Sequence, residues 1–239
     1  MIDPIIPELA AEGLLLQGAI AIDDLGEDVR TTLAESGFDL TGSTSLVLLG
    51  QVGGRLWKRH VSRRLDMPNP FDDVTVELVS TWIENAHPNA LFSIVYPGPA
   101  PVPLGRLAER LGWGSPSPLG LTIHPEHGLW IAHRIAFLTD LAFSRPQTPG
   151  PHPCSTCADT PCVTACPVGA VSLNTGFDVE ACSVHRIETG SGCAEQCFAR
   201  NVCPVGGNNR YEPAQMRHHY ASGLASIREW LEKSDEMPL

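Results

Sequence analysis

The sequence predicts an α+β protein made of a larger α/β domain and a small domain held together by cysteine ligands. Three observations predict it. Strand-like and helix-like segments alternate in the first 144 residues. All 8 cysteines lie between Cys154 and Cys203. Residues 145–153 contain four prolines in nine positions, which suits neither a helix nor an inner strand. We therefore expect an α/β domain at 1–144, a proline-rich linker at 145–153, a cysteine domain at 154–210, and a C-terminal helix and tail at 211–239.

The composition is typical of a folded protein that stays in water. The chain has 239 residues, 43% of them hydrophobic, so the larger domain can bury a core without metals or disulfides. A formal net charge of −11 argues against a surface built for nucleic acid or anionic membranes. No stretch holds the ~20 apolar residues of a membrane span. The apolar residues 14–22 lack the preceding basic residues of a signal peptide. We therefore expect a cytoplasmic protein with reduced thiols and no membrane partner.

The spacing of the cysteines indicates metal chemistry. The first four have the spacing C-x2-C-x4-C-x3-C, the second four C-x10-C-x3-C-x5-C, and a proline follows the last cysteine of each set. The pattern resembles bacterial two-cluster ferredoxins, in which three cysteines hold one 4Fe–4S cluster and a fourth, before proline, holds the other. Such exchanged fourth ligands assign Cys154, Cys157, Cys162 and Cys203 to the first cluster, and Cys182, Cys193, Cys197 and Cys166 to the second.

The residues between the cysteines suit two clusters. Residues 170–173 and 177–179 read as strands joined by the turn 174–176, so we expect a hairpin, as between the halves of ferredoxin-like domains. The extra residues 183–192 lie inside the second cysteine set, and the sequence assigns them no role. Small side chains let backbone N–H groups approach cluster sulfurs. They are Ala158, Ala165, Gly169 and Ala170.

Other uses of the cysteines stay open. Structural zinc favours paired C-x2-C knuckles, and only Cys154 and Cys157 form one. Disulfides need an oxidising compartment, for which the N-terminus offers no evidence. The irregular second set also leaves open a second cluster that is absent or differently ligated.

A glycine-rich segment marks the first domain. Residues 45–49 read as a buried strand, 50–54 as a glycine loop and 55–65 as a helix. The loop can cradle phosphate or a flat cofactor, or it can be a tight turn in which glycine takes positive φ. Five basic residues follow it, namely Arg55, Lys58, Arg59, Arg63 and Arg64. On one helix the first, third and fourth would share a face, as a solvated surface or as a docking site for an anionic partner, a cofactor or an acidic redox protein.

Further elements follow from periodicity. Residues 91–96 and 119–123 read as strands, and 104–111 as a short helix. Apolar residues at helical spacing behind Pro213 predict an amphipathic helix over 213–233 that packs on the first domain.

Several histidines invite a metal-binding interpretation. Two of them, His124 and His127, lie in the turn HPEHG, whereas His133 lies in an apolar stretch that we expect to be helical. Without a clustered carboxylate partner, hydrogen-bonded structural histidines are expected. His218 and His219 are expected at the surface of the C-terminal helix.

The order of short segments in the chain resembles the group of epoxyqueuosine reductases, reductive dehalogenases and cobalamin-processing proteins. The segments are LGW at 111–113, HPEHGLW at 124–130 and LTDL at 138–141, followed by the cysteine run. The resemblance covers roughly residues 45–204. It implies a nitroreductase-like α/β domain that binds a corrinoid, and a bacterial-type two-cluster ferredoxin domain that supplies electrons to the cobalt.

The sequence departs from this group at residues that the chemistry uses. Epoxyqueuosine reductases carry an aspartate near a Pro-Val pair, regarded as the proton donor to substrate, whereas residues 98–102 here read GPAPV. The group's Tyr-Gly-x-Asp-Tyr-His stretch is missing, and NPFDD at 69–73 is nearest to its position. The helical-repeat extension of the tRNA enzymes is absent as well. Epoxyqueuosine reduction is therefore not predicted.

These observations predict an iron–sulfur redox protein that transfers electrons through two 4Fe–4S clusters, as an electron carrier or a reductase subunit with a redox partner protein. The alternative is a corrinoid-dependent reductase acting on a small substrate. A second alternative is a zinc-stapled interaction protein, which would be colourless. The sequence assigns no catalytic residue.

Overall fold

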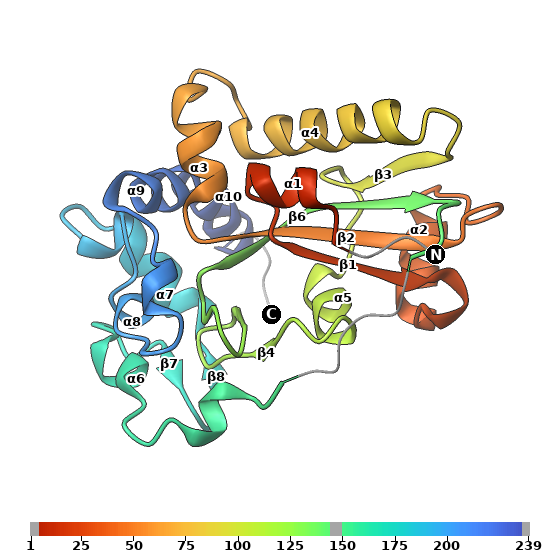
Figure 1. Cartoon of the computed structure of the whole chain (residues 1–239). Coiled ribbons are helices and arrows are strands. Elements are labelled where there is room, and N and C mark those ends of the chain that lie inside the picture. The colour runs from red at the N-terminus through yellow and green to blue at the C-terminus, as the bar shows by residue number, and fades with distance from the viewer. Residues whose placement is uncertain (1–4, 144–149, 236–239) are drawn as a thin grey trace. The chain divides into compact units, whose positions relative to one another are not determined.

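The computed structural model describes residues 5–143 and 150–235 (Figure 1). The described residues divide into two compact units. The sheet unit belongs to Met1–Gly114 and Ile131–Pro151, and the cysteine unit to Ser115–Trp130 and His152–Leu239. Residues 115–130, which the sequence pattern places in the first domain, thus group with the cysteines. Much of the expected linker and the last four residues of the expected tail lie outside the described residues, so those limits stay predictions.

The sheet unit is built on one antiparallel sheet of four strands in the order β1-β2-β6-β3. The strands are β1 (Leu16–Ala21), β2 (Ser45–Val52), β6 (Ile131–Thr139) and β3 (Phe92–Tyr96). The strands expected at 45–49 and 91–96 are confirmed as β2 and β3. Every residue of β2 is buried, because strands pair with both of its edges and helices cover both faces of the sheet.

Helices lie on both faces of this sheet (Figure 1). Successive residues of β2 alternate between two cores, so Leu46 and Leu48 enter one, and Val47 and Leu49 the other. The helix expected at 104–111 is confirmed, and helices with an antiparallel sheet confirm the α+β class. Within the described ranges no helix is long and apolar enough to cross a membrane. The first core includes η1 (Ile22–Asp24), α2 (Glu27–Glu35) and α5 (Leu104–Arg110), and the second includes α1 (Pro7–Glu12), α3 (Arg55–Arg59) and α4 (Pro70–Ala86).

Strand β6 corrects the helix expected around His133. These residues form an inner strand that pairs with both β2 and β3. Ile135 and Phe137 enter one core, whereas Ala136 and Leu138 enter the other. A strand buried on both faces is apolar at nearly every position, so periodicity does not distinguish it from a buried helix.

The glycine loop after β2 is a tight turn. Gly53 takes a φ of +58° where the chain turns into α3. Helix α3 has five residues and ends at Arg59, and Val61–Arg63 form a separate 3-10 turn, η2. The expected continuous helix over 55–65, with one shared basic face, is therefore wrong. Two of the basic side chains form ion pairs, Arg59 with Glu12 and Arg64 with Glu77.

The cysteine unit consists of short elements joined by turns. The expected hairpin is confirmed, since Val171 pairs with Phe177 and Ser172 with Gly176. The strand expected at 119–123 is shorter than predicted. In chain order the elements are β4 (Ser115–Pro116), β5 (Thr122–Ile123), η3 (Pro153–Thr156), α6 (Pro161–Ala165), β7 (Val171–Ser172), β8 (Gly176–Phe177), α7 (Val179–Ile187), η4 (Gly192–Ala194), α8 (Phe198–Asn201), η5 (Gly207–Asn209), α9 (Pro213–Ser222) and α10 (Leu224–Asp235).

The C-terminal helix is broken in two. Helices α9 and α10 replace the single expected helix and meet at Gly223, a residue with low helix propensity. Within the cysteine unit, α10 packs on α7 and α9 on η4. The expected packing on the first domain stays a prediction.

We predict that His133 titrates far below an ordinary histidine. Its ring lies 6.1 Å from that of Trp113, and its buried Nε2 has no hydrogen-bond partner among the described residues. Burial, with a smaller effect of the Arg134 charge, lowers the pKa of His133 to about 4. Unfolded histidine binds protons at about pH 6.5. The stability that neutral His133 contributes is therefore complete above that pH and is lost as pH falls towards 4.

The measurement is an NMR titration of carbon-13 histidine ring signals, with His133→Gln identifying the resonance. A midpoint near 4 is expected. A midpoint near 6.5 would contradict burial of this ring in the folded protein.

Candidate metal centre

Two cavities in the cysteine unit are each lined by four cysteines. A small cavity of about 30 Å³ is lined by Cys154, Cys157, Cys162 and Cys203. A larger one of about 330 Å³ is lined by Cys166, Cys182, Cys193 and Cys197. These are the two sets that exchanged fourth ligands predict. We call them the first and the second quartet.

Short helical turns position the first quartet. Cys154 lies in η3 and Cys162 in α6, and each element begins at a proline, which suits the first position of a helix. His152 Nδ1 accepts a hydrogen bond from the Cys154 N–H at 3.1 Å, and its Nε2 donates to the Pro116 carbonyl at 3.0 Å. The imidazole therefore joins the first cysteine to the 115–130 segment.

The 115–130 segment also supplies apolar walls to the first cavity. Leu119, Ile123 and Leu129 pack against Cys203 and Ala199 in one core cluster. The buried Arg200 side chain reinforces this packing, because its Nη2 donates to the Leu129 carbonyl at 2.6 Å. Residues that precede the cysteines in the chain thus help to enclose the first quartet.

Glycine is required where this segment meets the chain after Cys203. Gly128 has a φ of +61°, and a Cβ there would lie 2.1 Å from the Val205 carbonyl oxygen. Gly206 has a φ of +68°, and a Cβ there would lie 2.1 Å from the His127 carbonyl oxygen. Two backbones therefore approach at a distance that no side chain allows.

Helix α7 and the turn after it position the second quartet. Asp178 caps α7 by accepting from the Ala181 N–H at 2.9 Å, and Cys182 lies one turn into the helix. Ser191 Oγ accepts from the Cys193 N–H at 3.2 Å at the start of η4. The first half of the stretch 183–192, unassigned from sequence, continues α7.

Burial and mutual repulsion oppose ionisation of these thiols. Burial raises the pKa of Cys154, Cys162, Cys193 and Cys203, and it raises that of Cys182 to about 11. Thiolates of the same quartet raise these pKa values further, and each thiol that has this effect belongs to the same set as its neighbour. The electrostatic interactions between the thiols therefore divide the cysteines into the same two sets as the cavities do.

Backbone N–H groups offset part of this repulsion. The N–H of Phe198 lowers the pKa of Cys193 against the effect of burial, and the N–H of Val205 acts likewise on Cys203. The Arg200 N–H donates to Cys197 Sγ at 3.4 Å. Such N–H donors to sulfur are the surroundings that iron–sulfur clusters use. No three His, Cys, Asp or Glu side chains in residues 5–143 and 150–235 converge closely enough to hold a single metal ion.

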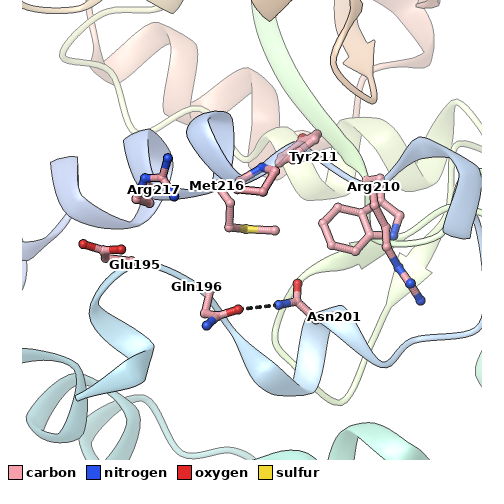
Figure 2. Close-up of a pocket in the computed structure, with 9 residues that line it drawn as sticks. Glu195, Gln196, Asn201, Arg210, Tyr211, Met216 and Arg217 are labelled. Carbon is pink, nitrogen blue, oxygen red and sulfur yellow. Dashed lines mark hydrogen bonds between the residues drawn. The ribbon is translucent and has the colours of Figure 1, made fainter. Parts of the chain in front are cut away.

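A third cavity, of about 360 Å³, lies beside the second (Figure 2). Figure 2 shows Gln196 and Asn201 at one wall, where Asn201 Nδ2 donates to Gln196 Oε1 at 2.9 Å. Gln196 lines the second quartet's cavity too, so the two cavities share a wall. The lining residues are Trp130, Glu195, Gln196, Asn201, Arg210, Tyr211, Pro213, Met216 and Arg217.

None of the three expected structural histidines is among the described residues that line the quartet cavities. His124 Nδ1 accepts from the N–H groups of Glu126 and His127, both at 3.1 Å, as in a capped turn. Burial, with repulsion from His127, lowers the pKa of His124 to about 4, so its ring is neutral at pH 7. His219 lies 5.2 Å from the Tyr211 ring and is half-buried rather than fully at the surface.

The sheet unit contains a set of interacting polar side chains to which the sequence analysis assigned no role. Burial raises the pKa of Asp72 although the Arg134 charge opposes it, and burial with the Asp72 charge raises the pKa of Tyr96. Arg134 Nε donates to Gln51 Oε1 at 3.1 Å, and its guanidinium lies 4.0 Å from the Phe71 ring centroid. Asp72 belongs to the NPFDD stretch, whereas residues 98–102 supply no carboxylate.

Comparison with known proteins identifies a fold. No family model and no curated protein matches the sequence. An epoxyqueuosine reductase solved with a tRNA-Tyr stem loop matches with a TM-score of 0.56 and 19% identity, over 87% of this chain and 66% of that one. The epoxyqueuosine reductase of Bacillus subtilis matches with a TM-score of 0.54 and 18% identity, over 82% of this chain and 62% of that one.

A catabolic reductive dehalogenase in complex with 3-bromo-4-hydroxybenzoic acid also matches, with a TM-score of 0.50 and 15% identity. The match covers 77% of this chain and 29% of the dehalogenase. The chain therefore spans about two thirds of the epoxyqueuosine reductases and under a third of the dehalogenase. The resemblance seen in the sequence is confirmed at the level of structure, since the chain has the fold of these reductases.

Proposed function

We propose that the protein is an iron–sulfur redox protein that passes single electrons through two 4Fe–4S clusters. The first quartet would hold one cluster and the second quartet the other. The observation that carries this proposal is that two separate cavities are each lined by four cysteines, in the sets expected for exchanged ligands. The protein would act as an electron carrier or as the electron-transfer part of a reductase, with a redox partner protein.

The donor set suits these clusters. When bound, they supply one-electron oxidation and reduction. The cysteine thiolates would hold the iron, and the N–H groups of Phe198, Val205 and Arg200 offset negative charge on the sulfurs. Leu119, Ile123 and Leu129 exclude water from the first cavity.

The second candidate is a corrinoid-dependent reductase that acts on a small substrate. The shared fold favours it, and so does the polar group in the sheet unit. Asp72 has a raised pKa and lies within electrostatic range of Tyr96 and Arg134, so it could hold and deliver a proton that residues 98–102 do not supply. In this candidate the clusters would pass electrons to the cobalt of a corrinoid.

Pairs of alanine substitutions test the ligand assignment. The purified protein is expected to contain about eight iron atoms, and loss of one cluster removes about four. Cys154→Ala with Cys203→Ala should remove one cluster, because both lie in the first quartet. Cys154→Ala with Cys166→Ala should remove both. Iron and acid-labile sulfide are measured in protein purified without oxygen.

Thr164→Ala is the matched control, since this exposed side chain lies between two of the cysteines and its variant should keep all its iron. The reverse pattern in the two double variants would show that the fourth ligands are not exchanged. A colourless protein that contains zinc instead of iron would support the zinc-stapled alternative and overturn the proposal.

Close backbone packing beside Cys203 makes a second prediction. In Gly128→Ala the new Cβ would clash with the Val205 carbonyl, so iron of the first cluster should be lost to a chelator several-fold faster than in the parent protein. Gly169→Ala is the control, because Gly169 also has positive φ but its Cβ would meet nothing within 4 Å. Equal rates of iron loss in the two variants would show that the close approach does not support the cluster.

Electron paramagnetic resonance separates the two redox candidates. The dithionite-reduced protein should show reduced-cluster signals, and an electron carrier should leave the spectrum of added cob(II)alamin unchanged. An altered cobalt spectrum would instead favour the corrinoid-dependent reductase. In that case Asp72→Asn should slow substrate reduction more than Asp73→Asn, which removes the neighbouring carboxylate.

A further inference from the structure

Arg186 is the one arginine or lysine among the residues that line the two quartet cavities. It lies on α7 four residues after Cys182, so both side chains occur on one face of the helix. The first cavity is lined by cysteines, prolines, apolar side chains and Ser117. His185 also lines the second cavity, but its Nδ1 pairs with Glu188 at 2.9 Å. The two cavities therefore differ in charge.

The guanidinium of Arg186 is held in place by α9. Its Nη2 donates to the Tyr220 carbonyl at 2.8 Å, and its central carbon lies 4.9 Å from the Tyr220 ring centroid. Tyr220 lines the same cavity, and so does Ile227 of α10. The C-terminal helices thus position a cation beside the second quartet.

One N–H donor of this guanidinium makes no hydrogen bond to the residues that the structure describes. Its Nε is buried and has no hydrogen-bond partner among the described residues. A buried donor without a partner is unfavourable, so such donors usually face an acceptor. Thiolate and sulfide sulfurs in this cavity would be acceptors. Burial raises the pKa of Cys182 and Cys193, and the Arg186 charge opposes that rise, which agrees with its proximity to their sulfurs.

We propose that Arg186 sets the reduction potential of the second cluster above that of the first, so that a single electron in the protein rests on the second cluster. The inference rests on the proposed function. One-electron reduction adds one negative charge to a cluster and releases no proton, so a fixed cation and an N–H donor beside it favour the reduced state. Arg210 is the nearest counterpart at the first quartet. It donates to the Cys203 carbonyl at 3.3 Å, and its charge lowers the pKa of Cys203 against the effect of burial. It is exposed and lies outside the cavity lining, however, so water screens its charge more than that of Arg186.

The test is a potentiometric titration of the holoprotein, followed by electron paramagnetic resonance. Cys203→Ala, which should keep only the second cluster, identifies the signals of that cluster. Arg186→Gln should lower the midpoint potential of the second cluster and leave the first unchanged. Arg228→Gln is the charge-matched control, since it removes one cation from an exposed site on α10 and should shift neither midpoint.

Arg186→Lys keeps the charge and removes the guanidinium. A midpoint between those of the parent and Arg186→Gln would show that charge and N–H donation both contribute, and a parent-like midpoint would support the charge as the cause. If Arg186→Gln loses the iron of its cluster, Tyr220→Leu decides instead, because it removes the ring that packs on Arg186. This variant should then lower the second midpoint.

An unchanged second midpoint in Arg186→Gln, or in Tyr220→Leu where that variant decides, would overturn the inference. Equal shifts in Arg186→Gln and Arg228→Gln would overturn it as well. Protein that never binds 4Fe–4S clusters fails the proposed function itself. The two failures are distinguishable, because iron and sulfide content are measured before each titration.

Discussion

The repulsion among the cysteine sulfurs gathered at each cavity is the constraint on which the cysteine unit depends. Burial raises the pKa of Cys154, Cys162, Cys182, Cys193 and Cys203, and the other thiols of the same quartet raise these pKa values further. In the proposed function, positive charge from bound iron would remove that penalty on ionisation, so folding of the unit and binding of metal would favour each other. The elements of this unit before α9 are two to nine residues long, and their packing centres on the cysteines. On the proposed function, the ligands would replace much of the apolar core that a small domain otherwise needs.

The exchange between the quartets joins the two cavities into one structure. Cys166 follows α6, which carries Cys162, yet it lines the second cavity. Cys203 follows α8, which begins directly after Cys197, yet it lines the first. Helices α6 and α8 pack on each other, so the position of one quartet fixes the other. The 115–130 segment closes the first cavity with apolar side chains, whereas α7 and the C-terminal helices bring a cation to the second. Each cavity is thus lined by four cysteines, but the residues around the two cavities differ.

Features that depend on residues close together in the chain could be predicted from the sequence. Packing between residues far apart in the chain could not. The two sets of cysteines stay a prediction from their spacing and from the proline after each set, whereas the hairpin at Val171–Phe177, expected from its turn residues, is confirmed. Periodicity failed at β6, because a strand buried on both faces has no polar side for a pattern to show. It also failed at Gly223, where one glycine separates two helices that share an apolar repeat. The partners of Arg186 lie 34 residues away at Tyr220, so its role had no local signal. In the sequence, Asp72 stood out only because NPFDD at 69–73 lies nearest to the position of the missing Tyr-Gly-x-Asp-Tyr-His stretch.

The shared fold restricts the function without choosing the reaction. One solved structure of this fold is an epoxyqueuosine reductase with an epoxyqueuosine-modified tRNA stem loop, and another is a reductive dehalogenase with 3-bromo-4-hydroxybenzoic acid. One fold thus serves different substrates. The features of this chain that suit electron transfer are local. They are the two cavities lined by cysteines, which the packing of α6 on α8 connects. What a reductase would need in addition is a proton donor near its substrate, and residues 98–102 supply none. Asp72 is the carboxyl group whose burial and neighbours best suit that task in the sheet unit. The proposal of electron transfer therefore rests on the geometry of the cysteines. Reduction of a small substrate depends on whether the half-buried carboxyl group of Asp72 meets a bound corrinoid and its substrate.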